Sequence, residues 1–124
     1  MSCEKNRHTL QLMCPQDAFM LGNIDSELYC PYQGFTNFPL VPQSKRGQLL
    51  SEVMMYDFNV HELNLYLDTH PCDKEAFAKL IQLQKKACEA RANYEQHFGA
   101  LTVSNLTECQ GYTWVCGPWP WQRQ

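Results

Sequence analysis

Cysteine is the residue type of this chain with the most chemistry to offer. Seven cysteines occur among 124 residues, and an odd number forbids complete pairing within one molecule. They are Cys3, Cys14, Cys30, Cys72, Cys88, Cys109 and Cys116. No two of them have the C-x-x-C spacing of zinc knuckles and thioredoxin-like sites, which argues against a metal or redox motif. We therefore expect at least one thiol to stay free or to bond between molecules.

Five of these cysteines are candidates for disulfides between molecules. They are Cys3, Cys14, Cys30, Cys109 and Cys116. The alternative interpretation is that Cys72 and Cys88 are small buried side chains and that the other cysteines have no particular role. Neither interpretation follows from the sequence alone, so cross-linking stays a hypothesis.

Histidine paired with a carboxylate is the second source of chemistry. Carboxylate-bridged metal sites in four-helix bundles are built on Glu-x-x-His pairs, and the four histidines do not supply that motif. The residues three positions before them are Lys5, Phe58, Leu67 and Tyr94. Asp57 and His61 are spaced to share a helix face, but such a pair is more often a solvated one than a metal site. We predict no catalytic residue, no metal site and no cofactor.

The composition excludes several classes of function. The net charge of −3 and the absence of a basic run longer than two residues argue against nucleic-acid binding. No run approaches the roughly 20 apolar residues that a helix needs to cross a bilayer. The polar start of the chain is followed by Cys14-Pro15 and not by a signal-peptide core, so we expect the protein to begin in the cytoplasm.

Two segments in the middle of the chain have the spacing of amphipathic helices. In the first, at about residues 47–69, apolar residues recur at steps of three and four. They are Leu49, Val53, Tyr56, Val60, Leu63 and Leu67. The second segment runs from the Asp73 cap to about His97, and its stripe contains Phe77, Leu80, Gln84, Ala87, Arg91, Tyr94 and Phe98. The two polar members of that stripe, Gln84 and Arg91, would need partners in a larger bundle.

The residues between the two helices predict a tight turn. Pro71 disfavours helical geometry at His70 and so ends the first helix. Asp73 is placed to accept hydrogen bonds from the free amides at the start of the second helix. We expect Asp68 and His70 to serve the turn through capping or local hydrogen bonds.

These patterns predict an all-α fold, namely an antiparallel two-helix hairpin with a loop-rich N-terminal arm and an extended C-terminal tail. The arm comprises residues 1–43, and the hairpin with its tail comprises residues 44–124. Proline and glycine interrupt any helical period in the arm, which either lies on the hairpin or folds only on a partner. The tail, residues 111–122, is rich in proline and tryptophan, which favours an extended backbone.

The first helix has more apolar surface than a single antiparallel helix can cover, and such a surface usually meets another protein. The predicted partner-binding residues are Leu50, Met54, Phe58 and Leu65 of this helix and Trp114, Trp119 and Trp121 of the tail. The partner could be a second copy of the chain, which would give homo-oligomers. For the tail, folding back over the hairpin and docking on a partner both stay open, and a role at a membrane surface ranks third because few basic residues are near.

Several motifs together resemble the CotJB family of bacterial spore coat proteins. They are Tyr56-Asp57-Phe58, Leu65-Tyr66-Leu67-Asp68-Thr69-His70-Pro71, Asp73-Lys74-Glu75-Ala76, Tyr94 with Phe98-Gly99-Ala100-Leu101, and Pro118-Trp119-Pro120-Trp121. The resemblance covers about residues 49–122 and leaves the arm unexplained.

The resemblance implies a structural component of the spore coat, made in the mother cell and assembled around the forespore. Its companions would be a small coat peptide and a manganese-catalase-like coat protein. Two alternatives stay open beside this non-catalytic role. One is an accessory subunit that stabilises a metalloenzyme, and the other is a thiol-based sensor of redox state or metal.

Overall fold

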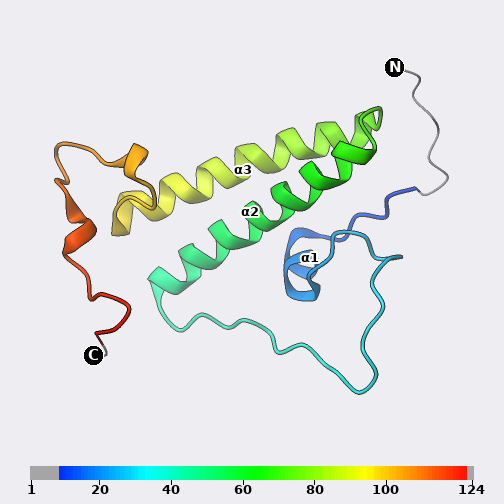
Figure 1. Cartoon of the computed structure of the whole chain (residues 1–124), viewed down its shortest axis with the longest axis horizontal. Coiled ribbons are helices and arrows are strands. Elements are labelled where there is room, and N and C mark those ends of the chain that lie inside the picture. The colour runs from blue at the N-terminus through cyan, green and yellow to red at the C-terminus, as the bar shows by residue number, and fades with distance from the viewer. Residues whose placement is uncertain (1–8, 123–124) are drawn as a thin grey trace.

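The fold is a pair of long helices with a short helix packed against one of them (Figure 1). The computed structural model describes residues 9–122, and Trp114 only through its backbone. The helices are α1 (Pro15–Leu21), α2 (Lys45–Thr69) and α3 (Lys74–Phe98), followed by two single 3₁₀ turns, η1 (Val103–Asn105) and η2 (Thr113–Val115). Within residues 9–122 there is no strand, so the predicted all-α class is confirmed.

Both long helices begin at capping side chains. The Oγ atom of Ser44 accepts a hydrogen bond from the amide of Gly47 at 3.0 Å, and α2 therefore starts at Lys45, two residues before the predicted start. The carboxylate of Asp73 accepts from the amide of Ala76 at 3.0 Å at the start of α3. Each cap satisfies an amide that the helix itself leaves without a partner.

The core lies between α2 and α3. The residues that α2 buries there include Leu49, Val53 and Leu63, and those that α3 buries are Ala76, Leu80, Leu83, Ala87, Ala90 and Tyr94. The α3 face differs from the predicted one, because Phe77 is 56% exposed and Ala76 is buried instead. Three alanines in this face have little volume, and small side chains let two helices approach closely.

The arm contains a helix that the sequence analysis did not predict. Pro15 is the first residue of α1, where the missing amide hydrogen of proline costs nothing. Gly22 follows the last residue with a φ of 75°, the left-handed geometry that commonly ends a helix. The proline and glycine that were interpreted as helix breakers are therefore the start and stop of a short helix.

The part of the arm around α1 lies on the helical pair, whereas residues 26–43 are mostly exposed. Ala18 of α1 and Ile24 are buried in one hydrophobic cluster with Leu63 and with residues of α3. Leu10 and Met13 pack against the same cluster. The amide of Met13 donates to the carbonyl of Ile24 at 2.9 Å, which ties the two sides of α1 together.

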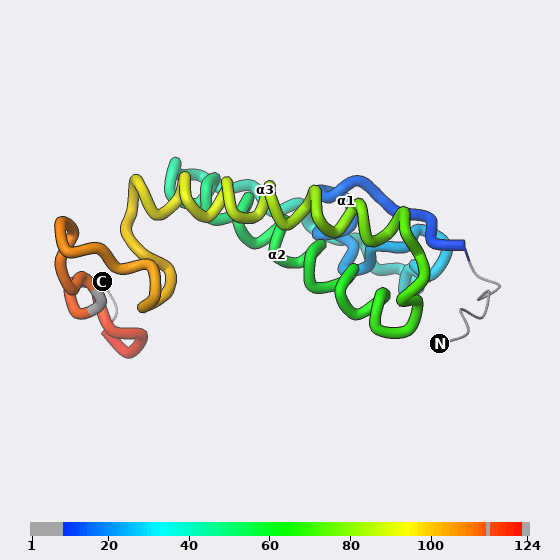
Figure 2. The backbone as a smooth tube through the Cα atoms, turned by 90° about the horizontal axis from the view of Figure 1, so that it is seen from above, coloured from blue at the N-terminus to red at the C-terminus, as the bar shows by residue number. Residues whose placement is uncertain are grey.

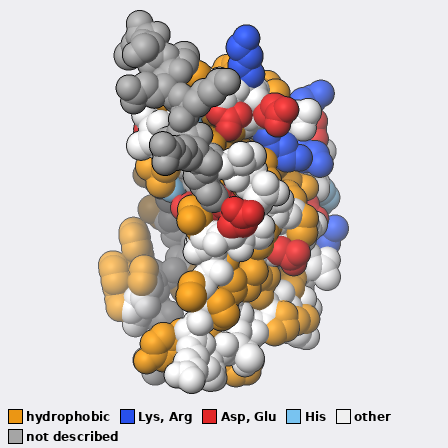
Figure 3. Space-filling view, turned by 90° about the vertical axis from the view of Figure 1, so that its right-hand side faces the viewer, with side chains coloured by type: hydrophobic (Ala, Val, Ile, Leu, Met, Phe, Trp, Pro, Cys, Tyr) orange, Lys and Arg blue, Asp and Glu red, His pale blue; other side chains and the backbone are white. Residues whose placement is uncertain are grey.

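The stretch between α1 and α2 is extended and open. Residues 26–43 hold no helix or strand, and several of their large apolar side chains are exposed. These are Leu28, Tyr32, Phe35, Phe38, Leu40 and Val41. Figure 3 looks at the end of the molecule where the α2–α3 turn lies, and hydrophobic side chains gather over the lower part of that view, on the side of the arm. Charged side chains gather over its upper part.

The C-terminal segment continues beyond the end of α3, on the opposite side of the molecule from α1 (Figure 2). Gly99 ends α3 with a φ of 96°, and Leu101 packs against the second hydrophobic cluster, formed by Leu49, Val53, Ala90 and Tyr94. Past that point most residues are exposed. None of the described helices has the length and apolar character that crossing a membrane requires.

Candidate interaction surfaces

The turn between α2 and α3 is organised by Tyr66. Its hydroxyl group donates a hydrogen bond to Oδ2 of Asp73 at 2.8 Å, and its ring stacks on the ring of His70 with centroids 4.1 Å apart. Nδ1 of His70 lies 3.0 Å from the carbonyl oxygen of Tyr66, and Thr69 Oγ1 donates to the same carbonyl. Pro71 forms the bend, and Asp68 is exposed. One aromatic side chain thus connects both ends of the turn.

The pKa values at this turn are shifted in the directions that the contacts require. Burial, the hydrogen bond to Asp73 and the nearby negative charges raise the pKa of Tyr66 to about 12, because each disfavours the phenolate. The amide of Ala76 lowers the pKa of Asp73, with the Tyr66 hydroxyl adding to the effect, because both donate to the carboxylate. Asp73 is therefore ionised at neutral pH while Tyr66 keeps its proton.

A second polar link joins the two long helices near their middle. Arg91 of α3 donates to Oδ2 of Asp57 of α2 at 2.5 Å, and both side chains are partly exposed. Arg91 was expected in the apolar stripe of its helix, and this ion pair is the partner that such a residue needs. Gln84, the other polar member of that predicted stripe, is exposed. The seam of the pair is therefore apolar, with its one described ion pair at the edge.

The predicted partner-binding residues do not lie on one surface. Met54 and Leu65 are about half exposed, whereas Leu50 packs against the second cluster. Phe58 is covered in part by Phe19 of α1, with the ring centroids 5.9 Å apart in an edge-to-face arrangement. The Phe58 side chain therefore already has a partner inside the molecule.

The tail presents two of its tryptophans as a stacked pair. The rings of Trp119 and Trp121 are parallel to within 4°, with centroids 5.3 Å apart, and Trp121 is 75% exposed. The side chain of Gln122 accepts a hydrogen bond from the amide of Trp119 at 3.0 Å, which closes the turn that brings the rings together. Trp114, the third predicted tryptophan, has its side chain outside the described residues.

Sequence reasoning placed Phe77 in the buried stripe of α3 with Ile81 beside it, and did not predict either as a partner-binding residue. Phe77 and Ile81 are exposed and stand one helical turn apart, so they share a face of the helix. The signal for them was present in the sequence, because Ala76, Leu83 and Ala90 fit the same three-and-four spacing as the predicted core stripe. If those smaller residues face α2, then Phe77 and Ile81 must face outward.

The six cysteines among the described residues lie at the surface. Five are free and exposed, namely Cys14, Cys30, Cys88, Cys109 and Cys116. Cys72 is disulfide-bonded and exposed, and Cys88 is exposed on α3, so the interpretation of these two as buried side chains is wrong. Cys3, the fifth predicted cross-linking residue, lies outside the described residues. The thiols are therefore placed where other molecules can reach them.

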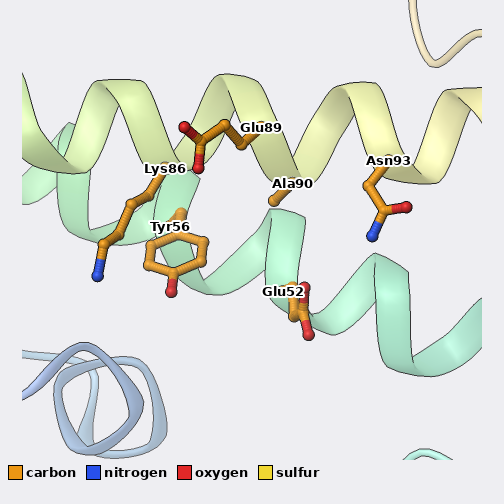
Figure 4. A pocket seen from close by; sticks show the side chains of 6 residues that line it. All are labelled: Glu52, Tyr56, Lys86, Glu89, Ala90 and Asn93. Atoms are coloured by element: carbon orange, nitrogen blue, oxygen red, sulfur yellow. The ribbon is translucent and has the colours of Figure 1, made fainter.

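A shallow groove runs between α2 and α3 (Figure 4). It has a volume of about 240 Å³ and is lined by Glu52, Tyr56, Lys86, Glu89, Ala90 and Asn93. The ammonium group of Lys86 lies 6.0 Å from the centre of the Tyr56 ring, the outer limit of a cation–π contact. No group of three or more metal-binding side chains occurs among the described residues. The groove holds no arrangement of nucleophile, base and orienting group.

A family comparison decides what kind of protein this is. The family model described as CotJB protein matches residues 47–122. The chain belongs to the CotJB family. No curated protein and no solved structure matches it. The CotJB family is a spore coat family and is not known as a family of enzymes, so the protein is related to the spore coat.

The segment that matches the CotJB family has clear limits in the structure. It begins at the third residue of α2 and contains the Tyr66–Asp73 turn, all of α3 and the stacked tryptophans. It leaves out α1 and the rest of the arm. The two long helices, but for the first two residues of α2, and the tail thus lie in the segment that the family model matches, and α1 lies outside that segment.

Proposed function

We propose that this CotJB protein is a non-catalytic structural component of the spore coat that assembles with other coat proteins. The expected companions are a small coat peptide and a manganese-catalase-like coat protein. Assembly would begin in the cytoplasm of the mother cell and end in the coat. The observation that carries the proposal is the exposure of large apolar side chains on a chain too small to bury them.

Two surfaces of the helical unit support this role. The first is the outward side of the helices, where Met54 and Leu65 of α2 and Phe77 and Ile81 of α3 are exposed. When another chain covers these apolar side chains and removes them from water, the complex is stabilised by roughly 25 cal/mol for each Å² of apolar surface buried. Leu50 and Phe58, which the sequence also predicted, already pack inside the molecule against the second cluster and against Phe19, so they are not part of this proposed surface.

The second surface is the stacked pair of Trp119 and Trp121. Tryptophan is enriched among the residues that carry most of the binding energy in protein interfaces. The alternating prolines of Pro118-Trp119-Pro120-Trp121 restrict the backbone, so ordering this segment on a partner costs little entropy. Trp114 belongs to the same proposed surface by its position in the sequence.

Co-expression tests the proposal. The chain is produced with and without the manganese-catalase-like coat protein, and the mass of the purified material is measured by light scattering under reducing conditions. We expect a complex of defined mass with the partner. A stable monomer that ignores the partner would contradict the proposal, because its apolar faces would then be satisfied without assembly.

A matched pair of variants locates the interface. Leu65→Ser removes an exposed apolar side chain, and Asn64→Ser changes its exposed polar neighbour on the same helix turn. We expect Leu65→Ser to weaken the complex at least tenfold and Asn64→Ser to leave it unchanged. Equal effects of the two substitutions would place the interface away from this side of α2.

A further inference from the structure

The outer side of α2 carries a binding site for a short helix, and α1 occupies it. We define this α1-binding site by Phe58, Asn59 and Leu63 of α2. Phe58 contacts Phe19 edge to face, and Leu63 lies in one buried cluster with Ala18, whose side chain is fully buried. The contact is closely fitted, because no part of the Ala18 side chain reaches solvent.

The centre of the site is a polar anchor. The side-chain amide of Asn59 donates to the carbonyl oxygen of Pro15 at 3.1 Å and to the carbonyl oxygen of Met55 at 2.8 Å. Asn59 is 3% exposed, so its amide depends on the helix that covers it for one of these two bonds. The site therefore fits a helix with a small residue above Leu63 and, at its first residue, a carbonyl oxygen that can accept a hydrogen bond from Asn59.

The α1-binding site lies within the segment that matches the CotJB family, and α1 lies outside that segment. All three residues of the α1-binding site lie in the segment that the CotJB family model matches, whereas α1 lies wholly outside it. The helical unit by itself thus includes a buried amide and apolar side chains that its own two helices do not cover. Without α1, this site would be open to solvent or would be covered by another chain.

The link between occupant and site is long, and the side-chain amide of Asn37 connects it to α1 by donating to the carbonyl oxygen of Met20 at 2.7 Å. Residues 26–43 contain no helix or strand and are mostly exposed. At about 3.3 Å per residue this segment can span roughly 60 Å, which exceeds the roughly 37 Å length of α2. The helix is therefore tethered by a segment long enough to reach the same site on a neighbouring molecule.

We propose that the segment of residues 9–25 exchanges between copies of this chain, so that α1 of one molecule occupies the α1-binding site of another. The occupant is the same segment with the same contacts, so exchange needs no new interface, as in domain swapping generally. The tether favours the closed monomer in dilute solution, and the high local concentration of an assembling layer favours exchange. This inference deepens the proposed assembly role and rests on it for its biological meaning.

Complementation between two full-length variants tests the exchange. Ala18→Arg cannot dock its own helix but leaves the site on α2 intact, and Asn59→Arg blocks the site but leaves α1 intact. Each variant alone is expected to be a monomer under reducing conditions. Mixed at equal concentrations, they should form a species of twice the mass of one chain, because the free α1 of one variant fills the empty site of the other.

A matched control distinguishes exchange of α1 from non-specific association between the variants. Gln16→Arg introduces the same charge at an exposed position of α1, where docking in the same molecule persists. A mixture of Gln16→Arg and Asn59→Arg should therefore stay monomeric. If this control mixture dimerises as well, or if the Ala18→Arg and Asn59→Arg mixture stays monomeric at millimolar concentration, the exchange is overturned.

A second measurement guards against loss of folding in a variant. A fluorescently labelled peptide of residues 9–25 is added to each full-length chain, and its anisotropy is recorded. We expect the peptide to bind Ala18→Arg at least tenfold more tightly than wild type and not to bind Asn59→Arg. No difference between the chains would refute the proposal. Both tests use only this protein, so their failure leaves binding to other coat proteins, and hence the proposed function, unaffected.

Discussion

Tyr66 and Asp73 are joined by a hydrogen bond across the α2–α3 turn, with 2.8 Å between the Tyr66 hydroxyl oxygen and Oδ2 of Asp73. Oδ1 of the same carboxylate accepts from the amide of Ala76. One acidic side chain thus caps α3 and holds the last turn of α2. Both residues fall in the segment that the CotJB family model matches.

The Tyr66 hydroxyl is expected to stabilise the fold. Tyr66→Phe removes the bond to Asp73 and should lower the free energy of unfolding by about 1 kcal/mol, measured by urea denaturation. Tyr112→Phe, at an exposed position, is the matched control and should change little. Equal stabilities of Tyr66→Phe and wild type would show that the bond contributes nothing.

The hydrogen bond between Tyr66 and Asp73 should also affect how the stability of the protein depends on pH in alkaline solution. Because the folded state raises the pKa of Tyr66 to about 12, above the usual value of 10.0, its contribution is complete below pH 10 and is lost as the pH rises toward 12. Tyr66→Phe should lack this part of the alkaline destabilisation. Thermal unfolding of both proteins, measured from pH 9 to pH 12, makes the comparison.

Acid should remove the contribution of Asp73 to the free energy of unfolding. The folded state lowers the pKa of this carboxyl group, so its stabilisation is present above the unfolded pKa of about 3.9 and is lost as the pH falls through the lower, folded value. Asp73→Asn keeps a good capping residue and removes the charge. We expect Asp73→Asn to remain folded at neutral pH and to show a flatter loss of stability between pH 5 and pH 2.

Asp73→Ala is the comparison that isolates the cap. It removes both the charge and the acceptor and should cost about 0.5–2 kcal/mol at neutral pH, more than Asp73→Asn. If the two variants lose the same stability at pH 7, the charge and not the cap carries the effect.

The ion pair of Asp57 and Arg91 should add little stability. Both side chains are partly exposed, and pairs of this kind contribute about 0–1 kcal/mol. A double-mutant cycle with Asp57→Asn and Arg91→Gln should give a coupling energy below about 1 kcal/mol that shrinks further in 1 M salt. A larger coupling that resists salt would mean that the pair is shielded from solvent by another chain.

The stacked tryptophans should serve binding more than folding. Trp119→Ala combined with Trp121→Ala removes two exposed side chains from the C-terminal segment, whose backbone runs beyond the end of α3 (Figure 2), so we expect an unchanged melting temperature for the isolated protein. The same double substitution should weaken the complex with the coat partner. A fall in the melting temperature would instead mean that the tail folds back over the helices in solution.

The exposed thiols should react in the folded protein. We expect Cys14, Cys30, Cys88, Cys109 and Cys116 to be modified quickly by a thiol reagent without denaturant, as followed by mass spectrometry. Disulfide-linked species in non-reducing gels of purified coat would then support cross-linking after the spore is released. Replacement of all seven cysteines by serine with no change in behaviour would dispose of thiol-based sensing.

Helix limits and caps were predictable from the sequence because their signals are local. Ser44, Asp73 and Pro71 each act within a few residues, and the long helices were predicted to within two residues at each end. The α1 helix was not predicted because its seven residues are too few for a periodic pattern and its stop and start residues were interpreted as breakers.

Contacts between distant segments were harder to predict. Spacing alone cannot decide between Phe77 and Ala76 as the residue facing α2, since both fit a three-and-four repeat, and close packing favours the alanine. Asn59 looks like an ordinary polar helix residue in the sequence. Its burial depends on Pro15, which lies 44 residues earlier, and no local pattern contains that relationship.

The described chain starts beside the α2–α3 turn and finishes beyond the far end of α3, so the molecule has two chemically different poles (Figure 1). α1 lies toward the first pole, and the C-terminal segment with the stacked tryptophans lies at the other (Figure 1). A sheet in which all copies stood upright in the same sense would therefore have two unlike sides. Antibodies raised against α1 and against the tail would each label one side of such a sheet, and electron microscopy of the labelled sheet would reveal its polarity.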